Sequence, residues 1–194
     1  MNKCSCKLVV AVSGMPGSGK STLAKKIAEW LGLRMVSAGS LFRSLATQKG
    51  LTLSELSRIA EEDPSIDKMI DEMSLSEASK GCVVIDAHIA GWILKNVAHF
   101  RIYLTAPEDV RAKRIAERDG KSYEDALREL RMREESERRR FKTYYGIDIR
   151  DLRSFDLVIN TASFSAEEVF EISKKAIELK LKTLCRTPHL ERGL

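Results

Sequence analysis

The sequence predicts an α/β fold in which a central parallel sheet of five strands has helices on both faces. Short apolar runs alternate along the chain with segments of helical periodicity, which is the order that a parallel sheet with crossover helices requires. The first run leads into a glycine-rich turn and then into an amphipathic helical pattern. At 194 residues the chain suits one well-buried domain rather than two, so residues 1–194 are expected to form a single domain.

Five apolar runs are expected to form the strands. Each run is short and ends at polar or turn-forming residues, which is typical of strands buried on both faces of a parallel sheet. The runs are Leu8–Val12, Met35–Val36, Cys82–Ile85, Phe100–Leu104 and Leu157–Ile159.

Apolar residues at helical spacing predict the first and last helices. After the first strand, Leu23, Ile27 and Leu31 recur at i, i+4 and i+8 and form one apolar face. The tail from Ala166 is expected to be a helix that packs back on the sheet, because it repeats the pattern. Its apolar positions are Val169, Ile172, Ala176 and Leu179.

A long helical stretch over residues 39–80 exceeds what one crossover helix requires, so we interpret it as an inserted substrate-binding subdomain. Thr52–Glu55 has the pattern of a capping box, which predicts a helix over residues 53–62. The pair Asp63-Pro64 ends that helix and starts another, which Gly81 stops.

The turn after the first strand is a complete phosphate-binding motif, G-x-x-x-x-G-K-S. It comprises Gly14, Met15, Pro16, Gly17, Ser18, Gly19, Lys20 and Ser21, followed by Thr22. Glycines let backbone N–H groups approach phosphate oxygens, and the helix that follows presents its positive end to the anion. Lys20 is expected to reach the β- and γ-phosphates of a nucleoside triphosphate, while the Ser21 hydroxyl ligates the Mg²⁺ that comes with the nucleotide. The alternative is a glycine-rich turn that binds no ligand.

Residues just after the strands are candidates by position, because ligands of open α/β sheets bind beyond the carboxyl ends of the strands. Asp86 follows the third apolar run and is expected to bind Mg²⁺ directly or through water. It could instead cap the next helix, and both roles can coexist. Ser37–Arg43 follows the second run in the same way.

At Ser37–Arg43 the chain resembles the nucleoside monophosphate kinases, and within them the archaeal type of cytidylate kinase. Segments throughout residues 8 to about 180 share this resemblance, and the narrowest are Ala90-Gly91-Trp92 and Tyr145–Asp148. The resemblance implies a P-loop kinase fold, ATP with Mg²⁺ as donor, and CMP or dCMP as acceptor in pyrimidine nucleotide metabolism. It also implies a core of about 8–38, 81–130 and 147–184, a monophosphate-binding insertion of about 39–80, and a lid of about 131–146.

The resemblance assigns the acceptor site to Ser37, Gly39, Arg43, His88 and Gly91. A guanidinium matches a phosphate in a bidentate way, which suits Arg43, although a surface arginine on a first helical turn is the alternative. Many relatives have Gly-Arg where this chain has Ala87 and His88. A histidine can bind phosphate but is largely neutral at pH 7, so acceptor binding should depend more on Arg43.

Arginines and glutamates alternate over residues 131–140, which is also the pattern of a solvated helix with i, i+4 ion pairs. In the kinase interpretation this segment is the lid, and a bend or break brings arginines over the triphosphate. We expect Arg133, Arg138 and Arg140 to act in catalysis. On a straight helix they could not all meet one phosphate, because Arg131 and Arg138 face away from Arg133 and Arg140.

Selection of cytosine over uracil requires an acceptor for the exocyclic amino group. Asp63 and Asp67 are the candidates, and Asp71 lies one turn further on the same side. Acidic residues also stabilise a helix N-terminus without any ligand, and Asp63 is an expected N-cap.

Two other functions stay open: a related kinase that acts on AMP or UMP, and a nucleotide switch or RNA-associated ATPase. The net charge of +5 suits nucleic-acid binders and phosphate-handling enzymes equally. The absence of an aromatic RNA-stacking pattern argues against nucleic acid as a partner. The chain has no apolar stretch near the ~20 residues that span a bilayer, so we expect a cytoplasmic monomer, without a membrane partner, whose four cysteines are free thiols.

Overall fold

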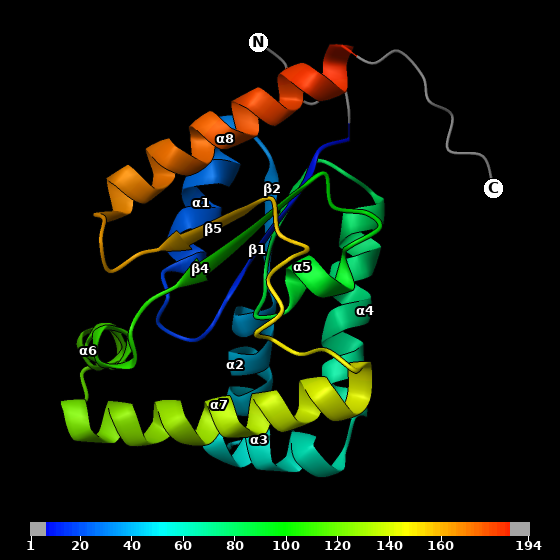
Figure 1. The fold of residues 1–194 in the computed structure, drawn as a ribbon. Helices are drawn as coiled ribbons and strands as arrows, with labels where there is room; N and C mark the ends of the chain where they lie inside the picture. Colours follow the sequence, from blue (N-terminus) through cyan, green and yellow to red (C-terminus); the bar gives the residue numbers. More distant parts are fainter. Residues whose placement is uncertain (1–6, 187–194) are drawn as a thin grey trace.

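The computed structural model describes residues 7–186 and contains the predicted five-stranded parallel sheet (Figure 1). The strands are β1 (Val9–Gly14), β2 (Arg34–Ser37), β3 (Val83–Asp86), β4 (Phe100–Thr105) and β5 (Leu157–Asn160). Their order across the sheet is β2-β3-β1-β4-β5, and every neighbouring pair is parallel. All residues of β1 and β3 are buried, because helices cover both faces of the central strands.

Helices α1 (Lys20–Leu31) and α8 (Ala166–Arg186) cover one face of the sheet. Leu23, Ile27 and Leu31 are buried there, as the spacing predicts. Of the predicted set, Val169 and Ala176 pack on the core beside Ile177, whereas Ile172 and Leu179 are exposed. The expectation for these two residues was wrong because they lie to one side of the stripe that Val169, Ser173 and Ile177 form at i, i+4 and i+8.

The opposite face is covered by the short α5 (Ala90–Ile93) and by α4 (Ser65–Ser79). Helices α2 (Ala38–Gln48) and α3 (Leu53–Glu62) precede α4 between β2 and β3. Thr52 and Glu55 form the predicted capping box at α3. Asp63 holds the start of α4, where its Oδ1 accepts a hydrogen bond of 2.9 Å from the backbone N–H of Ser65.

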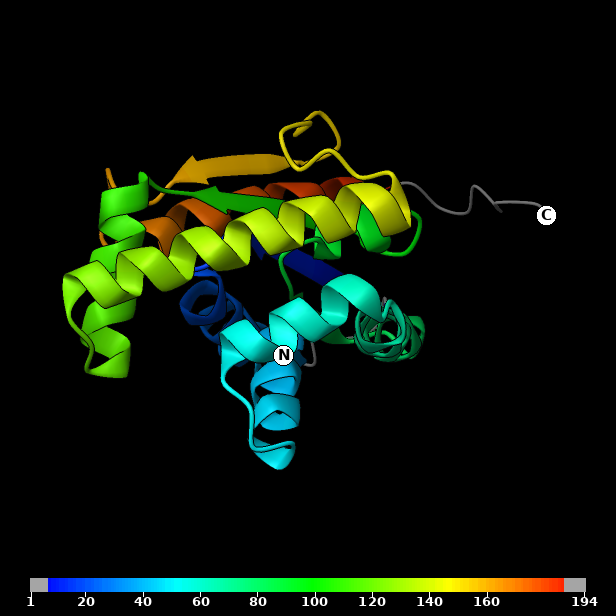
Figure 2. The same ribbon diagram turned by 90° about the horizontal axis from the view of Figure 1, so that it is seen from below.

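Helices α6 (Glu108–Asp119) and α7 (Tyr123–Tyr145) lie between β4 and β5 in sequence. Figure 2, a view from below Figure 1, shows α7 running across the molecule, with α6 beside the N-terminal end of α7. The expected bend or break in residues 131–146 is absent, because α7 is one continuous helix of 23 residues. It contains no Gly or Pro that would interrupt it, and it buries side chains along its length against its neighbours.

Two further expectations concern the cysteines and the membrane. Cys82 is disulfide-bonded, so the expectation of free thiols was wrong for this residue, while Cys4 and Cys6 lie outside the described residues. Across residues 7–186, no helix is both long enough and apolar enough to cross a bilayer.

Candidate active site

The phosphate-binding loop connects β1 to α1 in a conformation that requires glycine. Gly14 has a φ of +141°, and a Cβ there would lie 2.2 Å from the carbonyl oxygen of Leu104. A Cβ on Gly17 would lie 2.6 Å from the carbonyl oxygen of Arg111. Gly19 precedes α1 with a φ of +92°. The loop therefore fits tightly under β4 and α6 and leaves its helix N-terminus open to an anion.

This loop borders a cavity of about 730 Å³ at the carboxyl end of the sheet. Six of the nine predicted loop residues line it: Pro16, Gly17, Gly19, Lys20, Ser21 and Thr22. Gly14, Met15 and Ser18 do not line the cavity, but the Met15 carbonyl accepts a hydrogen bond of 3.0 Å from Lys20 Nζ. Burial lowers the pKa of Lys20 to about 8, although Asp86 and Glu137 act in the opposite direction.

Asp86, at the end of β3, forms hydrogen bonds with residues at the start of α1 and at the end of β2. Its Oδ2 accepts hydrogen bonds from the Ser21 hydroxyl at 2.6 Å and from the Ser37 hydroxyl at 2.9 Å. These groups fit Mg²⁺ that arrives with a nucleotide, since this ion takes one or two carboxylates and completes its shell with phosphate oxygens and water. Among residues 7–186 no cluster of three or more His, Cys, Asp or Glu side chains could hold a metal by itself.

Cations from separate elements line the same cavity. Arg43 on α2, Arg114 and Arg118 on α6, and Arg133 on α7 accompany Lys20. Burial and the neighbouring Arg118 and Arg133 lower the pKa of Arg43, whose Nη2 donates to the Ser40 hydroxyl at 3.0 Å. No acidic side chain within the described part of the chain forms an ion pair with Arg43. The cavity therefore carries positive charge that an anionic ligand would balance.

His88 lies at the base of this cavity against Glu137, a residue that sequence reasoning treated as part of a surface ion-pair pattern. His88 Nδ1 and Glu137 Oε2 are 2.8 Å apart, and Arg133 is 3.7 Å from the other oxygen. Burial lowers the pKa of His88. Burial alone would raise the pKa of Glu137, but His88, Arg133 and Arg140 bring it down to about 2. The spacing of 133, 137 and 140 on one helical face was the available signal.

A smaller cavity of about 70 Å³ continues from the larger one between α2, α4 and α7. The two cavities share Gly39, Arg43, Ala87, His88 and Arg133. Asp67, Asp71 and Arg140 line only the smaller cavity. Asp67 and Arg140 form an ion pair there, with side chains only 10% and 4% exposed.

Three of the predicted site residues lie apart from this group. Arg138 is exposed on α7, and Asp63 is exposed at the start of α4. Gly91 is buried, lines neither cavity, and donates its N–H to the Ser13 hydroxyl at 2.8 Å. A Cβ at Gly91 would lie 2.2 Å from the Phe155 ring, which packs against Trp92 and Tyr103. Gly91 thus permits close packing and does not contact the cavities.

Replacing Gly91 with alanine is therefore expected to lower the free energy of unfolding by about 1–3 kcal/mol, because the methyl group overpacks the aromatic cluster. Denaturant unfolding measures the loss. The same substitution should cost less in a Phe155→Leu background, since the two positions share the space. Unchanged stability in Gly91→Ala would contradict the packing role.

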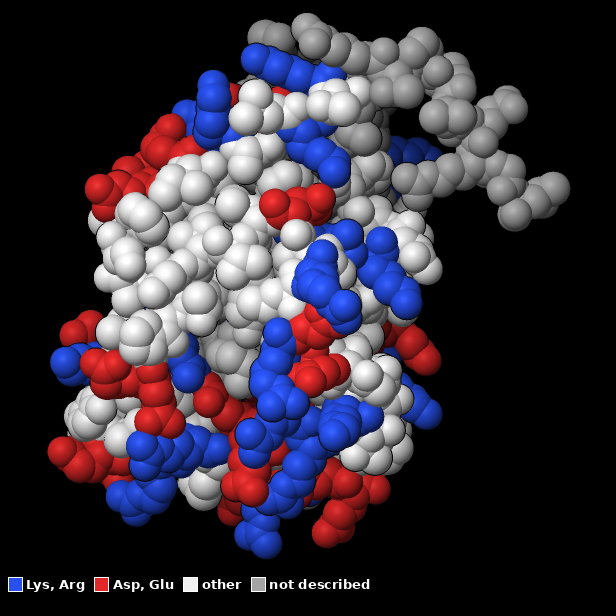
Figure 3. Space-filling model, in the orientation of Figure 1, with Lys and Arg blue, Asp and Glu red and all other residues white. Residues whose placement is uncertain are grey.

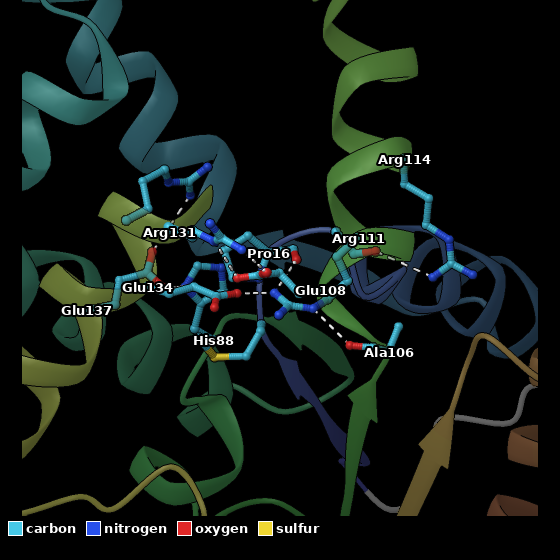
Figure 4. A network of polar contacts seen from close by, with 12 residues as sticks. Pro16, His88, Ala106, Glu108, Arg111, Arg114, Arg131, Glu134 and Glu137 are labelled. Atoms are coloured by element: carbon cyan, nitrogen blue, oxygen red, sulfur yellow. Dashed lines mark hydrogen bonds and ion pairs between the residues drawn. The ribbon is translucent and has the colours of Figure 1, made fainter. Parts of the chain in front are cut away.

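Two arginines of α6 were missed by sequence reasoning and connect the loop to its surroundings (Figure 4). Arg111 donates to the carbonyl oxygens of Ala106 at 2.9 Å and Pro16 at 3.2 Å and pairs with Glu134 on α7. Arg114 donates to the Thr161 hydroxyl and carbonyl, both at 2.8 Å. Their place just beyond the carboxyl end of β4 was the signal that could have identified them.

The outer surface near α7 carries charges of both signs. Figure 3 shows Lys and Arg interleaved with Asp and Glu at the end of the molecule where α7 lies. Several are paired, including Arg139 with Glu135 and Arg131 with Glu108. The charges at this end of the molecule are therefore mixed in sign and at least partly paired.

Comparisons with known proteins relate this site to a family. The model of the cytidylate kinase-like family matches residues 9–163. A cytidylate kinase of Ignicoccus hospitalis is 54% identical over 169 residues, which is 87% of this chain and 98% of that protein. A cytidylate kinase of Pyrococcus horikoshii is 48% identical over 172 residues, 89% of each chain.

Solved structures of other kinases share the fold. A gluconokinase from Sinorhizobium meliloti has a TM-score of 0.64 at 18% identity and covers 94% of this chain and 98% of its own. A shikimate kinase from Acinetobacter baumannii has a TM-score of 0.57 at 16% identity and covers 93% and 96%. At these identities the likeness extends to the fold alone.

Proposed function

Since the chain belongs to the cytidylate kinase-like family, we propose that it transfers the γ-phosphoryl group of ATP to CMP or dCMP, giving ADP and CDP or dCDP. It is an enzyme of the phosphotransferase class. The observation that carries the proposal is the junction of the two cavities, where Arg43 and Arg133 lie between the phosphate-binding loop and a second, smaller binding space.

ATP is proposed to occupy the larger cavity with its phosphates on the loop. The free N–H groups at the start of α1 and the Lys20 ammonium would hold the β- and γ-phosphates. Ser21 and Asp86 would hold Mg²⁺, which neutralises charge on the phosphate oxygens. Asp86 already accepts two hydroxyl hydrogen bonds, so its carboxylate is oriented before the nucleotide arrives.

The monophosphate of the acceptor is proposed to bind at Arg43, with Ser37, Gly39 and His88 nearby. Arg43 lacks an acidic partner among the described residues and is crowded by other cations, so an anion there would relieve repulsion. The acceptor base would then extend into the smaller cavity. The acceptor phosphate is already an oxyanion, so the transfer requires positioning and charge neutralisation and no general base.

Residues 39–80 would therefore form the acceptor-binding insertion and residues 131–146 the lid, attached to the core that the sequence predicts. Of the three proposed lid arginines, Arg133 lines both cavities and Arg140 lines the smaller one. Arg138 is exposed and would need a movement of α7 to reach phosphate.

The test is an assay of ADP production with ATP, Mg²⁺ and each acceptor in turn: CMP, dCMP, UMP and AMP. We expect turnover with CMP or dCMP to exceed turnover with UMP and AMP. Preference for AMP would favour a related kinase. ADP production that no acceptor stimulates would overturn the proposal in favour of an ATPase or nucleotide switch.

A further inference from the structure

The far end of the smaller cavity holds two carboxylates and one guanidinium. Asp67 and Asp71 lie one turn apart on α4, and Arg140 faces them from α7. Both oxygens of Asp67 accept hydrogen bonds from Arg140 Nη1. Asp71 forms no ion pair among the described residues, and its neighbour is the Tyr145 hydroxyl. Asp71 is therefore the carboxylate with acceptor capacity left for a ligand.

The Arg140 side chain is buried beside aromatic rings and has one N–H donor without a partner. The residue is only 3% exposed, and its guanidinium lies over the rings of Phe42 and Phe141 at 6.0 and 5.8 Å. Its Nε is buried and lacks a hydrogen-bond partner. A buried donor without a partner costs free energy, so a ligand acceptor at this point would be favourable.

A guanidinium beside a carboxylate complements cytosine and opposes uracil. Cytosine presents ring and carbonyl acceptors next to an amino donor, whereas uracil presents a carbonyl acceptor in place of that amino group and an N–H in place of the ring acceptor. Against this pair, uracil would place donor against donor and acceptor against acceptor. Such mismatches discriminate strongly because buried polar groups remain unpaired.

We propose that Asp71, rather than Asp67, accepts the hydrogen bond from the cytosine amino group of the acceptor. Asp67 is a positioning residue that directs Arg140 toward the acceptor edge of the same base. This inference rests on the proposed function, because it deepens the assignment of the acceptor.

The protonation state of Asp71 then sets how strongly the site prefers CMP over UMP. The groups around it are Asp67 on its own helix, and Arg140 and Tyr145 on α7. Burial raises the pKa of Asp71 to about 6 and Asp67 adds to this, while the neighbouring Tyr145 hydroxyl and the charge of Arg140 act in the opposite direction. Below this pKa the protonated carboxyl can donate to uracil, so discrimination falls. Above it the carboxylate accepts only from cytosine.

The first experiment compares kcat/KM for CMP and UMP at about pH 7.5 and about pH 5.5 in the unmodified enzyme. The CMP/UMP ratio should fall at the lower pH. Both substrates carry the same phosphate, whose own titration near pH 6 cancels in the ratio. A ratio that does not change with pH would overturn the role of Asp71 ionisation without requiring any variant to fold.

The second experiment compares Asp71→Asn with Asp67→Asn. Asp71→Asn should lower the CMP/UMP ratio at least about tenfold and remove its pH dependence, because the amide can offer a donor or an acceptor. Asp67→Asn should lower kcat/KM for both substrates while the ratio keeps its pH dependence. Glu72→Gln, on the exposed side of α4, is the matched control and should change neither quantity.

Measurements of melting temperature and of activity distinguish the remaining outcomes of these two experiments. Because the pKa of Asp71 is raised to about 6 in the folded state, the ionised carboxylate present above that pH destabilises the folded state relative to the unfolded state. Asp71→Asn should therefore not lower the melting temperature at pH 7.5. A ratio lost in Asp67→Asn and kept in Asp71→Asn would return the role to Asp67. Failure of the unmodified enzyme to phosphorylate any pyrimidine nucleotide would instead refute the proposed function.

Discussion

Lys20→Ala is expected to lower kcat by about 10²- to 10³-fold, while the protein stays folded. The ammonium is the mobile charge of the phosphate loop and would stabilise negative charge that develops on the transferring group. A single electrostatic donor of this kind contributes about 3–4 kcal/mol to activation. Single-turnover measurements with saturating ATP and CMP would separate this effect from a change in binding.

Two control variants make the result interpretable. Lys20→Met keeps the aliphatic stem and should be as inactive as Lys20→Ala, with stability no lower than that of the unmodified protein, because the ammonium is desolvated and its pKa is already lowered. Lys25→Ala removes a lysine from the same helix whose side chain is 73% exposed, and should leave activity unchanged. Near-normal turnover in both Lys20 variants would show that this loop is not the catalytic phosphate site.

Arg43→Ala is expected to raise the Michaelis constant for CMP by about 10- to 100-fold and that for ATP by much less. The range corresponds to losing a hydrogen-bonded contact with a charged group, worth about 1.5–3 kcal/mol. Arg43 lies where the two cavities meet, so its loss should act mainly on the acceptor. Steady-state kinetics with each substrate varied in turn measures the difference.

Stability and a surface arginine provide the controls for Arg43. Removing a cation that is crowded by Arg118 and Arg133 should not destabilise the folded state. Arg150→Ala removes an arginine whose side chain is 83% exposed and should change neither Michaelis constant. Equal damage to both constants in Arg43→Ala, or damage confined to ATP, would contradict the acceptor role.

Local patterns were sufficient to predict the elements of this fold. The five strands, the capping box at Thr52 and the helix that ends at Glu62 follow from neighbouring residues alone. The same holds for the loop glycines, because their φ values belong to one short segment. The expected break in α7 came from the kinase interpretation and not from the local pattern, which contains no Gly or Pro to interrupt the helix.

The composition of the smaller cavity was not accessible in this way. Arg140 and Asp67 are 73 residues apart, and Arg111 and Pro16 are 95 apart, so no spacing rule connects them. Helical geometry did place Arg133 and Arg140 on one face of α7. It could not predict which face of that helix turns toward the interior. From the sequence, Glu137 was therefore interpreted as a surface residue and Asp67 as a carboxylate without a partner.

Neighbouring residues are enough to specify a parallel α/β sheet with a phosphate-binding loop at its carboxyl end. Those features depend on periodicity and backbone conformation, which neighbouring residues decide. Which charged side chains contact one another depends instead on the tertiary structure. It placed α4 and α7 on two sides of the smaller cavity so that Arg140 engages Asp67 and leaves Asp71 with acceptor capacity, and it enclosed Glu137 beside His88. Burial gives those pairings their effect, because charges removed from water interact strongly and must be balanced by whichever groups the fold brings beside them.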